Sequence, residues 1–185
     1  DAEWEERREG DEFAPSLGKV PILWDGDIVV WDSMAIIEFL ADRFGPMLYW
    51  PEDEAARAVA RSMAAEMHSG FANLRRELPM NVRKSFPPKE LTDPVREEID
   101  RILQLWAQAR ARWGGTGDFL FGDWCAAEMM YAPVVTRFIT YGVKVPNFAG
   151  AYMKCVLSHP DVNEWIDKAQ DEPWVIEQYE AGKAA

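Results

Sequence analysis

Two polar residues, Asp32 and Ser33, open an expected helix directly after an expected strand, and this pair could bind a small anion. The apolar residues that follow, Ile36, Ile37 and Leu40, recur at helical spacing. The first turn of a helix carries backbone N–H groups without partners inside the helix, together with the positive end of the helix dipole. A carboxylate is the natural occupant of that position, so the pair predicts a small anionic-ligand site.

A second feature nearby, Gly18-Lys19-Val20-Pro21, could bind an extended, peptide-like molecule. Proline has no N–H to donate and restricts the residue before it to extended geometry. The Val20 backbone can therefore hydrogen-bond a peptide that lies alongside it like an added strand. The alternative is an ordinary hairpin packed on a helix, with no ligand.

A β-hairpin must position both features. One β-type run consists of Val20, Ile22, Leu23 and Trp24, and a second covers residues 28–31. Between them, Asp-Gly at positions 25 and 26 supplies the positive φ angles that a two-residue hairpin turn requires. Because the second run leads straight into Asp32, the sequence predicts a loop, a strand, a tight turn, a strand and a helix over residues 16–40.

The other residues capable of chemistry favour structural roles. A lone histidine on a helix, His68, is more often a packed or interface residue than a catalyst. The two histidines, His68 and His159, form no metal motif, so we expect no metal. Cys125 and Cys155 lack basic neighbours that would clearly depress their pKa, so thiolate chemistry is unsupported. The acidic run over residues 3–12 is expected to be a solvated face.

Composition excludes several classes of function. The 185 residues allow one large domain or two small ones, and 48% of them are hydrophobic, enough for a packed core. A formal net charge of −12 would repel a phosphate backbone, so nucleic-acid binding is not expected. No run is long enough to span a membrane, and two cysteines are too few for a secreted disulfide framework. We therefore expect a cytoplasmic protein that does not bind membranes.

Beyond a short linker after residue 44, the chain has helical periodicity, interrupted by a loop over residues 83–91 that contains Pro and Lys. One long helix is expected over residues 54–78, ended by Pro79. A second begins at Asp93-Pro94, with Asp93 as its N-cap, and closes at Gly114-Gly115. A third runs from about residue 125 to 141 through Pro133, and two shorter helices follow over residues 148–158 and 161–170.

The chain resembles the glutathione transferase family. The family carries a G-K-V-P loop, a β-hairpin and a Glu/Asp/Gln-Ser pair at a helix start, matched here by residues 18–21 and 32–33. The helical region resembles the family's bacterial branch in three segments, residues 63–80, 131–138 and 172–174. The resemblance implies an α/β plus all-α fold, in which a partial thioredoxin-like domain precedes an all-helical domain. It divides the chain into residues 1–44, a linker over 45–52, and residues 53–185.

The resemblance also implies a ligand. It places glutathione, as co-substrate, on Lys19, Val20, Pro21, Asp32 and Ser33, and makes the Val20–Pro21 bond cis. The expected activity is conjugation of the glutathione thiolate to a small hydrophobic electrophile, as in detoxification. A non-catalytic binding or scaffolding protein is the alternative. A hydrophobic-substrate pocket is expected at three residues of the helical region, Met67, Phe71 and Tyr131.

Two departures from the family pattern bear on these expectations. The family's buried third helix usually opens with Ser/Thr-x-x-Asp, but the aligned residues here are Cys125 to Glu128, and a thiol is a poor hydrogen-bond acceptor. In the family, a strand, a helix and a strand precede the G-K-V-P loop and carry the residue that activates the thiol. Only 15 residues precede residue 16 here, so we expect this chain to be part of a longer polypeptide, and its catalytic residue is unknown.

A homodimer is expected around the hairpin–helix edge and the helix over residues 54–78. That helix has more apolar and small residues than one buried face needs, namely Ala55, Ala58, Met63, Ala64, Gly70 and Phe71. Its polar flank, Arg57, Arg61, Glu66 and Arg75, could pair reciprocally across a two-fold axis. The resemblance implies the same arrangement, while the alternative is that the second face packs only within its own domain.

Overall fold

The computed structural model describes residues 2–180, with side chains from residue 5 onward except 177 and 178. The chain divides into two compact units, one covering residues 1–50 and the other residues 51–185. We describe each unit by itself. Among the described residues, no helix is long and apolar enough to cross a membrane.

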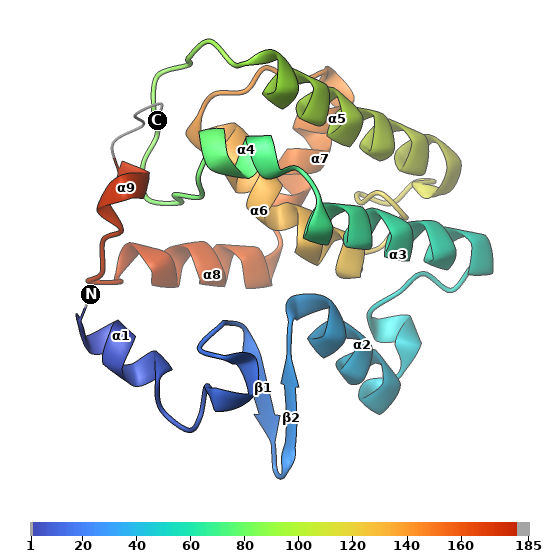
Figure 1. Ribbon diagram of the computed structural model, residues 1–185. Coiled ribbons are helices and arrows are strands. Elements are labelled where there is room, and N and C mark those ends of the chain that lie inside the picture. The colour runs from blue at the N-terminus through green and yellow to red at the C-terminus, as the bar shows by residue number, and fades with distance from the viewer. Residues whose placement is uncertain (1, 181–185) are drawn as a thin grey trace. The chain divides into compact units, whose positions relative to one another are not determined.

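The first unit is built around a two-stranded antiparallel sheet (Figure 1). Helix α1 (Ala2–Arg8) and a 3-10 turn (Ala14–Ser16) precede β1 (Ile22–Asp25) and β2 (Ile28–Trp31), and α2 (Ser33–Phe44) follows. In the sheet, Ile22 pairs with Trp31 and Asp25 with Ile28, so Gly26 lies in the turn with a φ angle of 61°. The predicted hairpin and helix are confirmed, but the two turn residues are Gly26 and Asp27 rather than Asp25 and Gly26, because Asp25 belongs to β1 and has no positive φ angle. Helix α1 was not expected in the acidic segment, and the first strand begins at Ile22 rather than at Val20.

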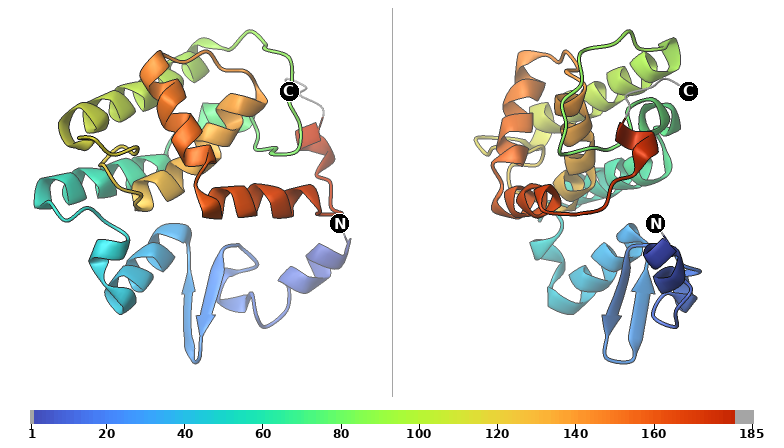
Figure 2. Two further views of the ribbon diagram at one scale, coloured as in Figure 1. Left: turned by 180° about the vertical axis from the view of Figure 1, so that it is seen from behind. Right: turned by 90° about the vertical axis from the view of Figure 1, so that its left-hand side faces the viewer.

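The second unit is all-helical. Its elements are α3 (Glu54–Ser69), α4 (Ala72–Glu77), α5 (Asp93–Trp113), α6 (Ala126–Thr140), α7 (Asn147–Leu157), α8 (Pro160–Gln170) and α9 (Glu177–Glu180). Helix α6 is the central element, in contact with α3 and α7 (Figures 1 and 2). The fully buried Trp106 of α5 fills the core against Tyr131, Phe138 and Tyr152, with ring centroids 4.8–5.8 Å apart.

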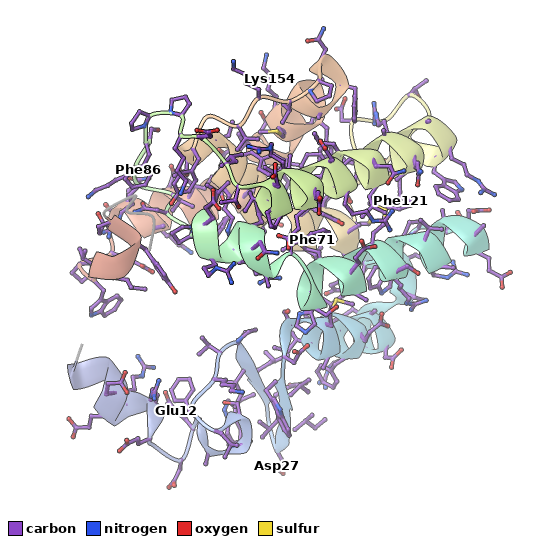
Figure 3. The ribbon with its side chains drawn as sticks, turned by 45° about the horizontal axis from the view of Figure 1, so that its top comes forward. Glu12, Asp27, Phe71, Phe86, Phe121 and Lys154 are labelled. Atoms are coloured by element: carbon purple, nitrogen blue, oxygen red, sulfur yellow. The ribbon has the colours of Figure 1, made fainter. Side chains whose placement is uncertain are left out.

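The single helix predicted over residues 54–78 is wrong, because the chain breaks into α3 and α4 at Gly70 and Phe71. Phe71 adopts a left-handed φ angle of 57°, and Figure 3 shows it at the junction. Arg75 donates hydrogen bonds to the carbonyls of Met67, His68 and Gly70 at the end of α3. The Glu98 carboxylate accepts hydrogen bonds from the backbone N–H groups of Asn73 and Leu74 at the start of α4. Side chains therefore satisfy the polar groups that the break exposes.

The start of α5 also differs from the prediction. Thr92, not Asp93, is its N-cap residue, and Asp93 is the first residue of the helix, paired with Arg96. The Thr92 hydroxyl donates to the Glu77 carboxylate, 2.7 Å away, instead of capping its own helix. His159 lies between α7 and α8 and is the N-cap residue of α8. Its Nδ1 accepts a hydrogen bond from the Asp161 N–H, and its ring stacks on Trp124 at 3.8 Å.

Glu128 joins a loop to the start of α6. It is fully buried, and its carboxylate oxygens accept the N–H of Leu120 at 2.9 Å and that of Cys125 at 3.0 Å. The carboxylate half of the expected capping box is therefore made, although Cys125 replaces the usual Ser or Thr. Burial raises the pKa of Glu128 to about 7, and burial first, then the Glu128 charge, raises the pKa of the Cys125 thiol. A thiol held in this protonated form is structural rather than reactive.

Candidate functional site

The hairpin brings the two candidate binding features of the first unit together. Because Ile22 pairs with Trp31, the next residues outward, Pro21 and Asp32, lie opposite each other. The Asp32 N–H donates a hydrogen bond to the Pro21 carbonyl at 3.3 Å and links the end of the loop to the start of α2. The loop and the helix start are therefore linked through two residues, Pro21 and Asp32, that are eleven positions apart in the sequence.

Asp32 is the N-cap of α2. Its Oδ1 accepts the N–H of Met34 at 2.9 Å and that of Ala35 at 3.4 Å. Its φ angle of 76° is unusual for a residue other than glycine, and such conformations are concentrated at ligand-binding places. Ser33 is half-buried and occupies the first position of α2, where the positive end of the helix dipole favours an anion.

The loop before the hairpin presents its backbone outward. The Val20–Pro21 bond is cis, as the resemblance implied. The Val20 side chain is 60% exposed, and within the part of the chain that the structure describes its N–H and C=O make no backbone hydrogen bond. The Lys19 side chain is exposed and supplies a positive charge beside this backbone.

A serine whose role the sequence did not reveal holds this loop in shape. The buried Ser16 hydroxyl lies 2.6 Å from the carbonyl oxygen of Lys19 and 3.0 Å from that of Phe13. Leu17 and Gly18 both have left-handed φ angles, which turn the chain toward Val20. A Cβ on Gly18 would stand 3.1 Å from the Arg8 carbonyl oxygen, so glycine is required there. The Ser16 hydroxyl therefore has a structural role in this loop.

The three residues expected to form a hydrophobic-substrate pocket lie in the helical unit and are buried there. Met67 is 3% exposed, Phe71 7% and Tyr131 0%. Tyr131 packs edge-to-face on Trp106, and its hydroxyl donates to the Met63 carbonyl at 3.4 Å. Phe71 borders a surface hollow together with Glu66 and Arg101, which pair with each other. Met67 and Tyr131 therefore contribute to the helical core as the structure stands.

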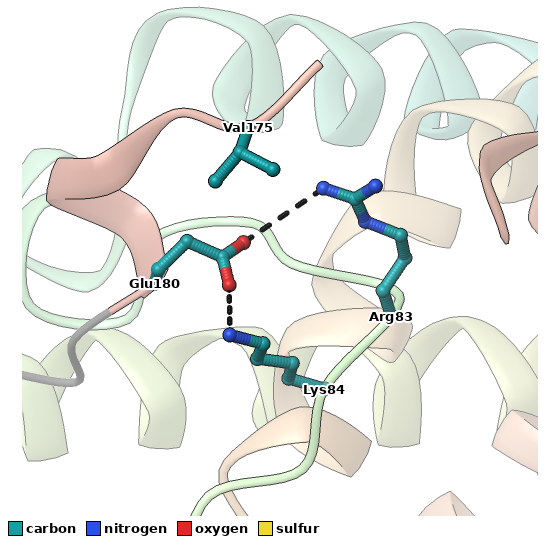
Figure 4. A pocket seen from close by; sticks show the side chains of 4 residues that line it. All are labelled: Arg83, Lys84, Val175 and Glu180. Carbon is teal, nitrogen blue, oxygen red and sulfur yellow. Dashed lines mark ion pairs between the residues drawn. The ribbon is translucent and has the colours of Figure 1, made fainter. Parts of the chain in front are cut away.

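Positive charge in the helical unit also gathers at Arg83 and Lys84, but both side chains pair with Glu180 (Figure 4). The Arg83 guanidinium further donates to the carbonyls of Glu172 and Trp174, at 2.8 and 2.9 Å. The hydrogen bond from Lys84 lowers the pKa of the Glu180 carboxyl. Because this cluster is satisfied within the chain, the loop and α2 of the first unit remain the candidate anion site.

Comparisons with known proteins show which sequences and folds this chain resembles. A sequence profile of the glutathione S-transferase N-terminal domain matches residues 2–43. Glutathione S-transferase GstB of Escherichia coli K12 is 29% identical over 122 residues, which cover 62% of this chain and 58% of GstB. Human glutathione S-transferase theta-2 is 27% identical over 176 residues, which cover 83% of this chain and 70% of that protein.

A solved structure shares the fold. A glutathione transferase homolog from Burkholderia, determined with bound glutathione, superposes with a TM-score of 0.64 at 23% identity and covers 84% of this chain and 75% of its own. The fold is thus a thioredoxin-like N-terminal part followed by a helical domain. With the sequence matches, it confirms that the chain resembles the glutathione S-transferase family. The chain spans 58% of the length of GstB.

Proposed function

We propose that this chain binds glutathione and conjugates its thiolate to a hydrophobic electrophile. The observation that carries the proposal is the hydrogen bond from the Asp32 N–H to the Pro21 carbonyl, because it unites an exposed peptide-docking backbone with a helix start. The cysteinyl backbone of glutathione lies along Val20, and its γ-glutamyl carboxylate lies at Ser33. The Asp32 carboxylate faces the γ-glutamyl ammonium, and Lys19 adds favourable charge for a ligand that is anionic overall.

In this reaction the glutathione thiol first loses its proton, since the thiolate is the nucleophile. A sulfur–carbon bond then forms at the electrophile, and either a leaving group departs or the electrophile takes up a proton. We assign the thiol-activating role to none of the described residues. The hydrophobic-substrate pocket at Met67, Phe71 and Tyr131 remains a proposal, which requires those buried side chains to become accessible to the electrophile.

Residues 1–44 are, in this proposal, the C-terminal part of the glutathione-binding domain, residues 45–52 the linker, and residues 53–185 the helical transferase domain. The proposed setting is a cytoplasmic detoxification reaction without a metal. The second candidate function is glutathione binding without turnover.

A paired measurement distinguishes the two functions. We expect saturable glutathione binding in a calorimetric titration, together with conjugation of a chloronitrobenzene followed by absorbance. Binding without conjugation would favour the binding or scaffolding function. Absence of glutathione binding would contradict both.

We also propose a homodimer that uses the exposed face of α3. Three residues expected at the dimer interface from the sequence are buried within the helical unit, namely Met63, Ala64 and Phe71. Glu66 is paired with Arg101, and Arg75 donates to carbonyls of its own chain. Small residues recur at helical spacing on the exposed face and permit close approach of a second helix, namely Ala55, Ala58, Ser62, Ala65 and Ser69, and Glu54 and His68 of the same helix are also exposed.

Sedimentation velocity at micromolar concentration tests the dimer. We expect a species of twice the 21.2 kDa mass of one chain. Replacing Ala58 with Arg should shift the population toward the single-chain mass, because the bulky charge blocks close packing. The matched replacement Ala151→Arg, at an exposed position of α7, should leave the mass unchanged. A species near 21.2 kDa that does not change on concentrating the wild-type chain would contradict the dimer.

A further inference from the structure

The hydroxyl of Ser16 donates its proton to the carbonyl of Lys19. Ser16 is only 4% exposed, and its Oγ lies 2.6 Å from the Lys19 carbonyl oxygen and 3.0 Å from that of Phe13. The Phe13 carbonyl already accepts the backbone N–H groups of Ser16 and Gly18, both at 3.1 Å. Because a serine hydroxyl has one proton to donate, the shorter contact assigns that proton to Lys19.

Ser16 therefore holds the Lys19 backbone at both of its polar groups. The Lys19 N–H donates to the Ser16 carbonyl at 3.2 Å, and the Lys19 carbonyl accepts the Ser16 hydroxyl. These contacts leave little freedom for the peptide group that joins Lys19 to Val20. The orientation of that group is set from the buried side of the loop.

The orientation of this peptide group decides where the Val20 N–H points. Among the described residues the cis bond is Val20–Pro21, so the bond between Lys19 and Val20 is trans. In a trans peptide group the C=O and the N–H point in opposite directions. Since the Lys19 carbonyl points to the buried Ser16 hydroxyl, the Val20 N–H points away from it. Val20 is 60% exposed, and its N–H donates to no backbone acceptor in the part of the chain that the structure describes.

We propose that Ser16 is a positioning residue for glutathione, whose hydroxyl turns the Val20 N–H toward a carbonyl oxygen of the ligand. The inference rests on the glutathione binding proposed above. Without the hydroxyl, the Lys19 carbonyl would lack its donor inside the loop, which is unfavourable. The peptide group would then rotate to expose this carbonyl to water, and the Val20 N–H would turn away from the ligand. A donor that is oriented before the ligand arrives lowers the cost of binding.

Residual dipolar couplings of the ligand-free, ¹⁵N-labelled chain measure the direction of the Val20 N–H bond. Ser16→Ala should change the Val20 coupling and leave the couplings of β2 as they are in the wild type. Ser16→Thr keeps the hydroxyl and should retain the wild-type coupling. This measurement needs no glutathione, so its result does not depend on the proposed function.

Calorimetric titration with S-methylglutathione measures the consequence for binding. Ser16→Ala should weaken binding by about fivefold, the effect of losing one neutral hydrogen bond, and Ser16→Thr should restore it. The matched control is Trp24→Phe, which removes the hydrogen bond from the Trp24 indole N–H to the Glu12 carbonyl at 3.0 Å. Glu12 belongs to the segment that leads into the same loop (Figure 3), but this bond does not hold Lys19. Trp24→Phe should therefore leave the affinity unchanged.

The outcomes separate the role of Ser16 from the proposed function. An unchanged Val20 coupling in Ser16→Ala, while the wild type binds glutathione, would overturn the role of Ser16 alone. Equal loss of affinity in Ser16→Ala and Trp24→Phe would show general loosening of the segment and would also overturn it. Absence of glutathione binding by the wild-type chain would contradict the proposed function and, with it, a role for Ser16 in positioning this ligand.

Discussion

Replacing Glu128 with Ala should lower the free energy of unfolding by about 3 kcal/mol, because two buried N–H groups lose the carboxylate that accepts their hydrogen bonds. Those groups belong to Leu120 and Cys125, and the carboxylate that binds them is fully buried. In a chain of this size the melting temperature should fall by about 10 °C. The matched control is Glu97→Ala, at an exposed position of α5, which should change stability by less than about 0.5 kcal/mol. Equal stability of the two variants would contradict the role assigned to Glu128.

The pH dependence of stability gives an independent check on Glu128. Burial raises its pKa to about 7 in the folded chain, above the ordinary value of 4.5. The folded state therefore retains this proton more readily than the unfolded state does. The contribution of Glu128 protonation to the free energy of unfolding is fully present below pH 4.5 and is lost as the pH rises through 7. Glu128→Gln cannot titrate. Across this range, the stability of the wild type relative to Glu128→Gln should fall, and a constant difference would contradict the raised pKa.

Ser33→Ala should weaken glutathione binding by about 5- to 30-fold, which corresponds to loss of a charge-assisted hydrogen bond at the start of α2. Asp32→Ala should weaken it by a similar factor but should also destabilise the chain, because Asp32 caps α2 through Met34 and Ala35. Asp32→Asn separates the two effects. An asparagine can still cap the helix and tolerates a positive φ angle, yet it lacks the charge that faces the ligand's ammonium group.

Calorimetry of these variants has a control within the same unit. Asp27 lies exposed at the hairpin turn (Figure 3), and Asp27→Asn should leave glutathione affinity unchanged. If Ser33→Ala and Asp32→Asn both bind glutathione as tightly as the wild type does, the ligand does not lie at α2. If Asp27→Asn weakens binding equally, the effect reflects overall charge rather than contact.

The sequence predicted the first unit well where local chemistry decides the structure. Gly26 supplies the positive φ angle of a tight turn and Asp32 is a strong helix cap, so the hairpin and α2 followed from short-range rules, although the turn pair is Gly26-Asp27 rather than Asp25-Gly26. Helix α1 was not predicted, because its segment is mostly charged and has no apolar residues at helical spacing. The hydrogen bonds by which Ser16 anchors the loop could not be predicted, because they depend on two carbonyl groups whose positions only the folded backbone defines.

In the helical unit, periodicity located most of the helices but not their junctions. Apolar residues continue at helical spacing through Gly70 and Phe71, so the pattern concealed a break that Arg75 and Glu98 stabilise from either side. Periodicity also cannot tell which apolar residues are covered. From the sequence pattern, Met67 and Tyr131 could line a pocket or lie in the core. In the structure, Tyr131 packs on Trp106 in the core.

The central claim is that glutathione lies along Val20 and at the start of α2, and amide chemical shifts test it most directly. We would titrate the ¹⁵N-labelled chain with S-methylglutathione, which cannot form disulfides, and follow its ¹H–¹⁵N spectrum. The account predicts saturable shifts of the Val20 and Ser33 amide resonances, with those of α7 unchanged. Saturable shifts confined to the helical unit, or no shifts at millimolar ligand, would contradict it.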